Sequence, residues 1–327
     1  MEQKVLRTGT LVVVCAIILR LASGLVGSVS LSLSPKIASF LIFMQTGRVI
    51  RPGNISFSPK PTESPEVTEP PPPTEPDLPV FSEQEAAAIG ITSTFSYAAD
   101  LPALLTQPLS WELTGDEPKV LIVHSHGSES FAPTGDYQET TPYHTLNKDY
   151  NMVSVGKYVE ELLEGAGISV LHDTTLHDEP SYNAAYTNSR KSVQTYLQEY
   201  PTITLVLDLH RDSLEDEKGN QLVQSVFSQG TTVAPLMLVV GTDYGGLHHP
   251  QWRENFALAL KLQTQLEDIC PGICRNINLR TQRFNQDLSP GAMLVEIGAS
   301  GNTRQEALRA AEVLAKAVIS LAHGSRS

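Results

Sequence analysis

Two histidines and two glutamates stand beside or within apolar runs of this chain, where folding can bring them together. His126 and Glu129 form an H-x-x-E motif shortly after one apolar run. His210 ends a second run, and Glu296 lies inside a third. Two histidines and one carboxylate, with a fourth position open to water, are a common ligand set for catalytic zinc. The pattern therefore predicts that His126, Glu129 and His210 bind Zn²⁺.

Glu296 is the candidate catalytic residue of such a site. A bound zinc ion lowers the pKa of water to about 7 and polarises a carbonyl oxygen. Hydrolysis also needs a group that takes the proton of the attacking water and passes it to the leaving amine, and a carboxylate can do both. We assign this role to Glu296. In the alternative arrangement Glu296 is a metal ligand and Glu129 becomes the base.

Other polar residues near these motifs are candidates for supporting roles. His124 lies two residues before His126, so both face the same side if the strand continues. His124 is either the ligand in place of His126 or a residue that orients a ligand through hydrogen bonds. Asp208 and Asp212 flank His210, and either carboxylate can hold its imidazole.

Three residues are candidates for substrate binding: Arg211, Arg190 and Asn285. The planar fork of Arg211 can bind a substrate carboxylate through two hydrogen bonds, and the alternative is an ion pair at the surface. Arg190 lies on a predicted helix, where packing is the alternative role. Asn285 belongs to a polar segment that precedes the last apolar run.

Strand and helix patterns alternate along the part of the chain that must position these residues. Short apolar runs predict strands at residues 120–123, 168–171, 203–209, 235–240 and 292–297. Helices are predicted over residues 152–165, 183–200 and 252–269, and a capping box at 303–306 opens a last helix. The alternation predicts an α/β fold, a mostly parallel twisted sheet with helices on both faces. Sites in such sheets lie at the carboxyl ends of the strands.

Three parts of the chain differ in composition. Residues 1–36 contain an apolar stretch from Leu11 to Leu33 that predicts a single membrane anchor, and a cleaved signal peptide is the alternative. Residues 37–110 are predicted to be an extended linker, with nine prolines between positions 59 and 79. Residues 111–327 are the predicted catalytic domain. Both alternatives for the N-terminus export this domain from the cytoplasm.

Charge and cysteine content argue against two classes of protein. The formal net charge of the 327 residues is −13, whereas nucleic acid binding needs clustered Lys and Arg, so we expect no nucleic acid partner. Three cysteines are too few for a disulfide scaffold. Cys270 and Cys274 can form a local disulfide or be two ordinary buried thiols, and we favour the second interpretation.

Several motifs, in the same order along the chain, resemble the stage II sporulation protein P family. The resemblance runs from about Val120 to the C-terminus. It rests on the segments VLIVHSHGSESF at 120–131, HDTTLHD at 172–178, PSYNAAY at 180–186, DLHRD at 208–212, NQDLSPG at 285–291 and ASGNT at 299–303.

The resemblance implies an N-acetylmuramoyl-L-alanine amidase of the zinc amidase fold, with additional endopeptidase activity on peptide cross-links. It implies a single-pass protein of the cell membrane whose domain lies outside the cytoplasm, in the intermembrane space of the sporulating cell. There it would act on septal peptidoglycan during forespore engulfment. The implied partners are stage II sporulation proteins D and M. His126, Glu129 and His210 match the family's metal-binding motifs, and Glu296 matches its catalytic glutamate.

Two other functions fit the same residues. A zinc carboxypeptidase or a cross-link endopeptidase would use the same H-x-x-E motif with a distant histidine and glutamate. A wall-binding scaffold that has lost catalysis is the third possibility, and it is disfavoured because no member of the predicted set is missing.

Overall fold

The computed structural model describes residues 81–323, apart from 110–111, 135–136 and 138–140. All of these belong to one compact unit of the chain, Pro72–Ser327. The predicted anchor at 1–36 and the Pro-rich segment at 59–79 lie outside the described residues. Among the residues described, no helix is both long and apolar enough to cross a bilayer.

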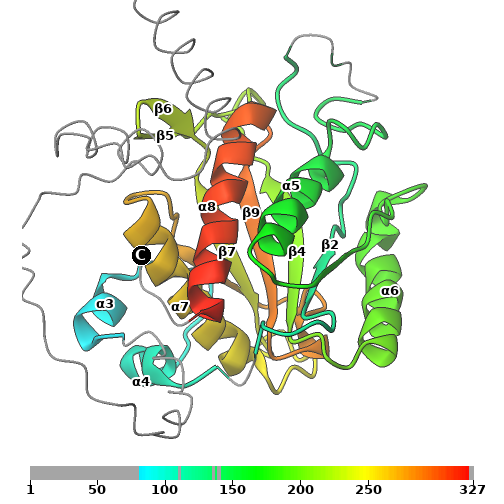
Figure 1. Ribbon diagram of the computed structural model, residues 1–327. Coiled ribbons are helices and arrows are strands. Elements are labelled where there is room, and N and C mark those ends of the chain that lie inside the picture. Colours follow the sequence, from blue (N-terminus) through cyan, green and yellow to red (C-terminus); the bar gives the residue numbers. More distant parts are fainter. Residues whose placement is uncertain (1–80, 110–111, 135–136, 138–140, 324–327) are drawn as a thin grey trace, which may run out of the picture. The chain divides into compact units, whose positions relative to one another are not determined.

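In the described part of the chain, seven strands form one sheet in the order β1-β8-β7-β9-β4-β2-β3 (Figure 1). They are β1 Ile91–Ser93, β2 Val120–Val123, β3 Val170–His172, β4 Leu205–Asp212, β7 Leu236–Gly241, β8 Ile277–Arg280 and β9 Ala292–Ala299. Two further strands, β5 Val226–Ser228 and β6 Thr231–Val233, form a separate antiparallel hairpin.

Every neighbouring pair in the seven-stranded sheet is parallel except β7 and β9. The predicted mostly parallel sheet is therefore confirmed. It consists of two parallel blocks that run in opposite directions, β1-β8-β7 and β9-β4-β2-β3. The carboxyl ends of β2, β4 and β9 consequently meet at one edge, while β7 and β8 end at the opposite edge.

Helices cover both faces of the sheet, as predicted, but unequally (Figure 1). The helices and short helical turns are α3 Glu83–Ala88, α4 Leu101–Thr106, α5 Met152–Gly165, η1 Tyr182–Ala184, α6 Ala185–Glu199, α7 Trp252–Ile269, η2 Gln286–Leu288 and α8 Arg304–Ala322. The large core lies between the sheet and α5, α7 and α8. A smaller apolar cluster joins α6 to β2 and β4 on the other face.

Alternation along the strands assigns each residue to one of these faces. In β2, Val120 and Ile122 join the large core, whereas Leu121 and Val123 face α6. In β4, Leu209 joins the large core and Val206 faces α6. Even-numbered residues of β4 therefore point toward α6.

Local signals fix the helix ends where the sequence predicted them. Thr303 and Glu306 form the predicted capping box at the start of α8, in which each side chain satisfies a backbone N–H group of the other. Helix α5 ends before Gly167, whose φ of +83° is the left-handed conformation that glycine adopts readily.

The predicted start of the folded domain at residue 111 is wrong. Strand β1 pairs in parallel with β8, and Leu104 and Leu105 of α4 are buried in the large core. These elements lie in the predicted linker, but each spans only three to six residues, too few to show a periodic pattern. The predicted anchor and the Pro-rich segment are not affected by this correction.

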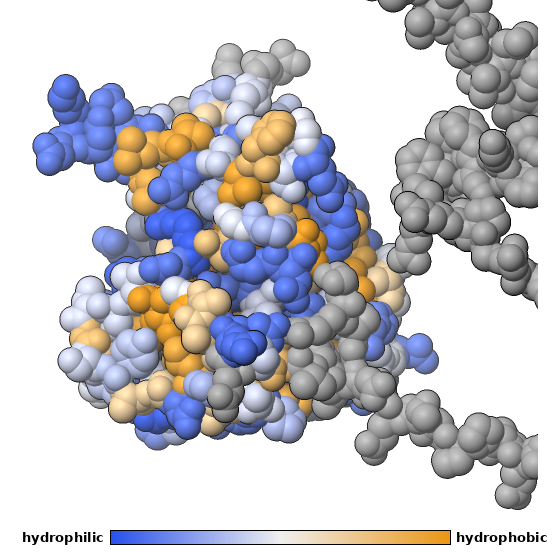
Figure 2. All heavy atoms as spheres, turned by 90° about the vertical axis from the view of Figure 1, so that its left-hand side faces the viewer, coloured by the Kyte–Doolittle hydropathy of each residue, from blue (hydrophilic) through white to orange (hydrophobic). Residues whose placement is uncertain are grey.

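Figure 2 shows the side of the molecule that carries α3, α4 and the β5–β6 hairpin. Hydrophobic residues on this side form separate patches between hydrophilic ones. Single exposed apolar side chains are normal on a folded surface. The hairpin carries the most exposed of the large apolar side chains described, Phe227, which is 75% exposed.

Candidate active site

The predicted ligands and base meet at the carboxyl ends of β2, β4 and β9. His210 and Glu296 are register partners on the parallel strands β4 and β9. His126 and Glu129 lie on the turn that follows β2, the other neighbour of β4. Because even-numbered residues of β4 face α6, the site lies on the α6 face of the sheet.

The H-x-x-E motif forms a tight turn that the protein holds on both sides. The backbone N–H of Glu129 donates to the carbonyl of His126 at 3.3 Å. Between them, the N–H and hydroxyl of Ser128 donate to Asp178 at 3.0 and 2.6 Å. Since Asp178 and Ser128 are both buried, these bonds are protected from water and fix the direction of the two predicted ligands.

His210 sits between two carboxylates. Its Nε2 is 2.8 Å from Asp208 Oδ1, and its Nδ1 is 3.6 Å from Glu129 Oε2. Burial disfavours the charged imidazole, but Asp208 and Glu129 outweigh it and raise the pKa of His210 well above its ordinary value. The same two carboxylates make this point of the site favourable for any cation.

Glu129 is held in its charged form. Burial alone would raise its pKa, but the Arg211 guanidinium and the His210 imidazole lower the pKa of Glu129 to about 2. A metal-binding carboxylate must be ionised. Glu129 therefore has the charge state that the predicted role requires.

Glu296 has the opposite electrostatic character. Removal from water is the main cause that raises the pKa of Glu296 to about 8, and the Glu129 carboxylate adds to it against the influence of His210. Glu296 Oε2 has no hydrogen-bond partner among the described residues. A carboxyl group that both accepts and releases a proton near neutral pH is suited to general acid–base catalysis.

Two tyrosines enclose His126. The ring of Tyr182 stacks on His126 with centroids 4.0 Å apart, and the ring of Tyr186 meets it edge-on at 5.4 Å. Burial, followed by the nearby His210, lowers the pKa of His126. Its Nδ1 has no partner within the described part of the chain, so a neutral ring with an available nitrogen faces the site.

The donor set fits a zinc ion in chemistry, although it is not assembled into a finished site. Within residues 81–323, as far as they are described, no group of three or more His, Cys, Asp or Glu side chains already has metal-binding geometry. The ring centroids of His126 and His210 are 5.5 Å apart. Two imidazoles on one tetrahedral zinc ion would have centroids roughly 5 Å apart. Nδ1 of His126 and Oε2 of Glu296 are both buried and have no hydrogen-bond partner among the described residues.

His124 does not share this site, contrary to the alternative in which it replaces His126. It points to the α5 face, where Nδ1 donates to the Leu209 carbonyl at 3.0 Å and Nε2 is 2.9 Å from His172 Nε2. A Cβ at Gly156 of α5 would collide with its ring, so this close packing requires glycine. Burial, followed by His172, lowers the pKa of His124 to about 3.

The comparisons with known proteins decide the family. Residues 60–319 match the family model of stage II sporulation protein P. The chain belongs to this family. A curated relative, stage II sporulation protein P of Bacillus subtilis (strain 168), is 27% identical over 215 residues, which cover 62% of this chain and 51% of the relative. This family member therefore spans about half the length of that curated relative.

Solved structures with a similar chain path include two amidases. The N-acetylmuramoyl-L-alanine amidase AmiC2 of Nostoc punctiforme gives a TM-score of 0.39 at 17% identity, over 63% of this chain and 96% of that one. The N-acetylmuramoyl-L-alanine amidase of Clostridium difficile 630 gives a TM-score of 0.37 at 13% identity, over 63% and 97%. Scores this low add nothing to the assignment of function.

Of the residues predicted to bind substrate, Arg211 is buried rather than at the surface. Its Nε donates to the Ser130 carbonyl at 2.9 Å and its Nη2 to the Tyr143 carbonyl at 2.8 Å. Its Nη1 is 3.8 Å from Glu129. The alternative of a surface ion pair is therefore wrong, and Arg211 holds the site loops together beside a predicted ligand.

Arg190 and Asn285 lie side by side, with Arg190 Nη1 3.4 Å from Asn285 Oδ1. Arg190 forms two hydrogen bonds of 2.8 and 2.7 Å to Asp287. Asn285 donates to the Tyr186 carbonyl at 2.9 Å and to Ser189 Oγ at 3.1 Å. Both residues thus fasten the start of α6, and their predicted role in substrate binding stays a prediction.

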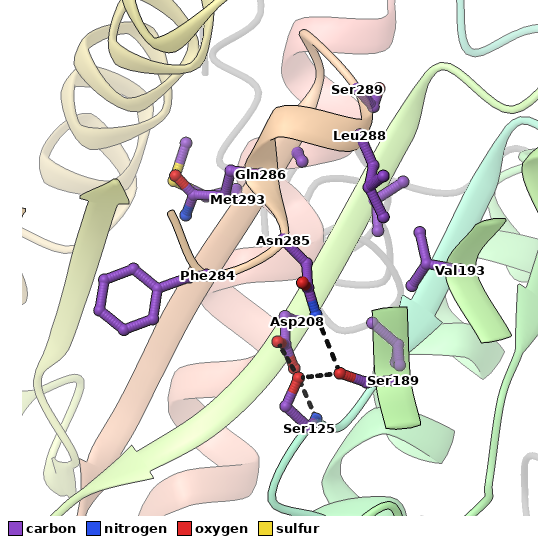
Figure 3. A pocket seen from close by; sticks show the side chains of 13 residues that line it. Ser125, Ser189, Val193, Asp208, Phe284, Asn285, Gln286, Leu288, Ser289 and Met293 are labelled. Atoms are coloured by element: carbon purple, nitrogen blue, oxygen red, sulfur yellow. Dashed lines mark hydrogen bonds between the residues drawn. The ribbon is translucent and has the colours of Figure 1, made fainter. Parts of the chain in front are cut away.

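A chain of hydrogen bonds links Asn285 to Asp208 beneath the site (Figure 3). Ser189 Oγ is 2.7 Å from Ser125 Oγ, and the hydroxyl and N–H of Ser125 donate to Asp208 at 2.6 and 2.8 Å. These residues line a cavity of about 10 Å³ between α6 and the sheet. The predicted supporting role of Asp208 thus has a structural basis, because the two hydrogen bonds from Ser125 fix the orientation of its carboxylate toward His210.

Sequence reasoning assigned no functional role to Tyr182, Tyr186, Asp178 or His144. The two tyrosines are four residues apart at the start of a helix, the spacing that puts side chains on one helical face. That signal was available, but it also fits ordinary helix packing. Asp178 and His144 reach the site through loops, for which no periodic pattern exists.

Proposed function

We propose that this chain is a zinc-dependent peptidoglycan hydrolase, an N-acetylmuramoyl-L-alanine amidase. It would cleave the amide that joins the lactyl group of muramic acid to the L-alanine of the stem peptide. Family membership and the pairing of His210 with Glu296 support the proposal. The single observation that carries it is Glu296, a carboxyl with a pKa near 8 and an unpartnered oxygen, held on the strand next to a histidine between two carboxylates.

Three side chains would hold the ion: His126, Glu129 and His210. A neutral His126 with an available Nδ1 and an ionised Glu129 are the forms that bind zinc. Asp208 would retain the Nε2 proton of His210 and turn Nδ1 toward Glu129, as carboxylates commonly do for metal-bound histidines. When bound, zinc polarises the scissile carbonyl and makes water more acidic.

The other steps belong to residues of the chain. Glu296 takes a proton from the attacking water and delivers it to the nitrogen of the departing L-alanine, so the carboxyl ends the cycle as it began. Burial raises the pKa of Glu296, which favours the protonated carboxyl that the second transfer needs. Tyr182 and Tyr186 shield His126 from bulk water, which strengthens electrostatic interactions within the site.

Family membership also supports the setting of the enzyme. We propose that residues 1–36 anchor the chain in the cell membrane, with the domain outside the cytoplasm in the intermembrane space of the sporulating cell. Stage II sporulation proteins D and M are the proposed partners. Protease added to intact protoplasts should remove the domain, and full protection would reverse the proposed topology.

Mass spectrometry of digested cell wall tests the reaction. Purified sacculi treated with the full chain and zinc should release whole stem peptides that begin with L-alanine and leave peptide-free glycan. Shortened or uncoupled stems would instead identify a carboxypeptidase or a cross-link endopeptidase. Binding to sacculi without any product, with zinc bound, would identify a non-catalytic scaffold.

A further inference from the structure

His144 is fixed beside the H-x-x-E turn by backbone bonds. It forms an antiparallel bridge with Glu129, and the N–H of Thr145 donates to the Ser128 carbonyl at 2.8 Å. The preceding carbonyl, that of Tyr143, accepts from Ser130 N–H at 2.9 Å and from Arg211 at 2.8 Å. The loop that carries His144 is therefore tied directly to the predicted metal ligand and to its neighbours.

The hydrogen bond of its Nδ1 sets the tautomer of His144. Nδ1 is 3.0 Å from the Pro142 carbonyl, which can only accept, so Nδ1 carries a proton. In the neutral ring, Nε2 is then an acceptor. Nε2 is buried and has no partner among the described residues. A buried polar atom without a partner is unfavourable, so a ligand group that supplies a hydrogen would be stabilised there.

Tyr182 connects His144 to the reaction centre. Its ring stacks on His126 at 4.0 Å and meets the His144 ring nearly at right angles, with centroids 6.0 Å apart. Although it touches both imidazoles, Tyr182 is 52% exposed. Tyr182 therefore presents a partly exposed ring beside both imidazoles.

We propose that His144 and Tyr182 form a substrate subsite in which Nε2 of His144 accepts a hydrogen bond from an N–H or O–H group of the substrate. This inference rests on the proposed function, because it assumes a substrate bound at the site. Stem-peptide amides supply N–H groups and the glycan supplies O–H groups. Tyr182 forms the wall along which that group approaches.

The hydrogen bond to His144 can be measured by binding experiments in a variant whose catalysis is slow. In the zinc-loaded full chain carrying Glu296→Gln, the dissociation constants of three probes would be measured by calorimetry: an intact disaccharide–peptide, the free stem peptide and the peptide-free disaccharide. Adding His144→Leu should weaken binding of the intact probe roughly 5- to 20-fold, as expected for one neutral hydrogen bond. His144→Gln, whose side-chain carbonyl can still accept, should lose less. His248→Leu on the exposed loop after β7 is the matched control and should bind as the background does.

Each outcome bears on the subsite in a different way. A loss with the stem peptide alone assigns the donor to an amide N–H, and a loss with the disaccharide alone assigns it to a hydroxyl. Both results support the subsite. Unchanged binding of all probes by His144→Leu and His144→Gln overturns it, as does a parallel fall in zinc content, which would make His144 a ligand. If the Glu296→Gln chain binds none of the probes, the proposed function fails before the subsite is reached.

Discussion

His210 and Glu296 face each other across the hydrogen-bonded ladder between β4 and β9. Adjacent strands lie about 4.8 Å apart, so the backbone itself holds the candidate base next to the candidate ligand. Sites built on strands are positioned more accurately than sites built on loops. His126 and Glu129, by contrast, depend on a turn that needs support from Ser128 and Asp178.

Removing the carboxylate behind His210 should weaken metal binding. Asp208→Asn replaces an acceptor of the Nε2 proton and removes a buried negative charge. Residues that hydrogen-bond a metal-binding histidine without touching the metal typically contribute 10- to 100-fold to metal affinity. We expect Asp208→Asn to lower the affinity by about that factor. Competition with a chelator measures it. Asp243→Asn, at the opposite edge of the sheet, is the control, and an unchanged affinity in Asp208→Asn would show that Asp208 does not orient a ligand.

Asp178 should stabilise both the fold and the ligand turn. Asp178→Ala leaves the buried N–H and hydroxyl of Ser128 without an acceptor, which should lower the free energy of unfolding by about 1–3 kcal/mol. Ser128→Ala removes only the hydroxyl bond and should cost less. Urea unfolding of both variants gives the comparison. Equal effects would mean that the backbone N–H bond contributes nothing.

Lys261 should make stability depend on alkaline pH. Its Nζ donates to the Leu105 carbonyl and lies 4.7 Å from the centroid of the Phe81 ring, and burial lowers the pKa of Lys261 to about 8. Between that value and about 10.4, the unfolded chain holds a proton that the folded chain has lost, so the free energy of unfolding must rise with pH. Relative to Lys261→Met, the parent should gain roughly 2–3 kcal/mol across this window.

Denaturant unfolding of the parent and of Lys261→Met at several pH values between 7.5 and 10.5 measures the difference in their free energies of unfolding. Groups common to both chains cancel in the comparison. Lys157→Met is the control, because that side chain is 70% exposed and is solvated before and after unfolding. A difference between parent and Lys261→Met that stays constant with pH would refute the prediction.

The sequence predicted the strands that carry the site because each is a short apolar run with a polar residue inside it or at its end. The predicted ends of β4 and β9, at residues 209 and 297, lie too early. Both strands continue past His210 and Glu296 to Asp212 and Ala299, since a polar residue that faces a site does not end a strand. The three strands belong to one sheet, as the sequence predicted.

The choice between His124 and His126 could not be made from spacing. Two residues apart on one strand, they would face the same side. Strand β2 ends at Val123, and the turn that follows sends the two rings to opposite faces of the sheet. The point at which the strand gives way to the turn decides which way each ring faces, and a sequence pattern does not reveal that point.

Glu296→Gln, with zinc content and release of stem peptides from sacculi measured on the same preparation, tests the central claim most directly. The substitution keeps the shape of the side chain and removes its basic oxygen. The predicted result is zinc close to the level of the parent and turnover lower by roughly 10² to 10⁴, the usual contribution of general acid–base catalysis. His210→Ala should instead lose both zinc and turnover, because two protein ligands hold the ion poorly. Near-normal turnover in Glu296→Gln with zinc bound would contradict the mechanism, and loss of zinc would make Glu296 a ligand and Glu129 the candidate base.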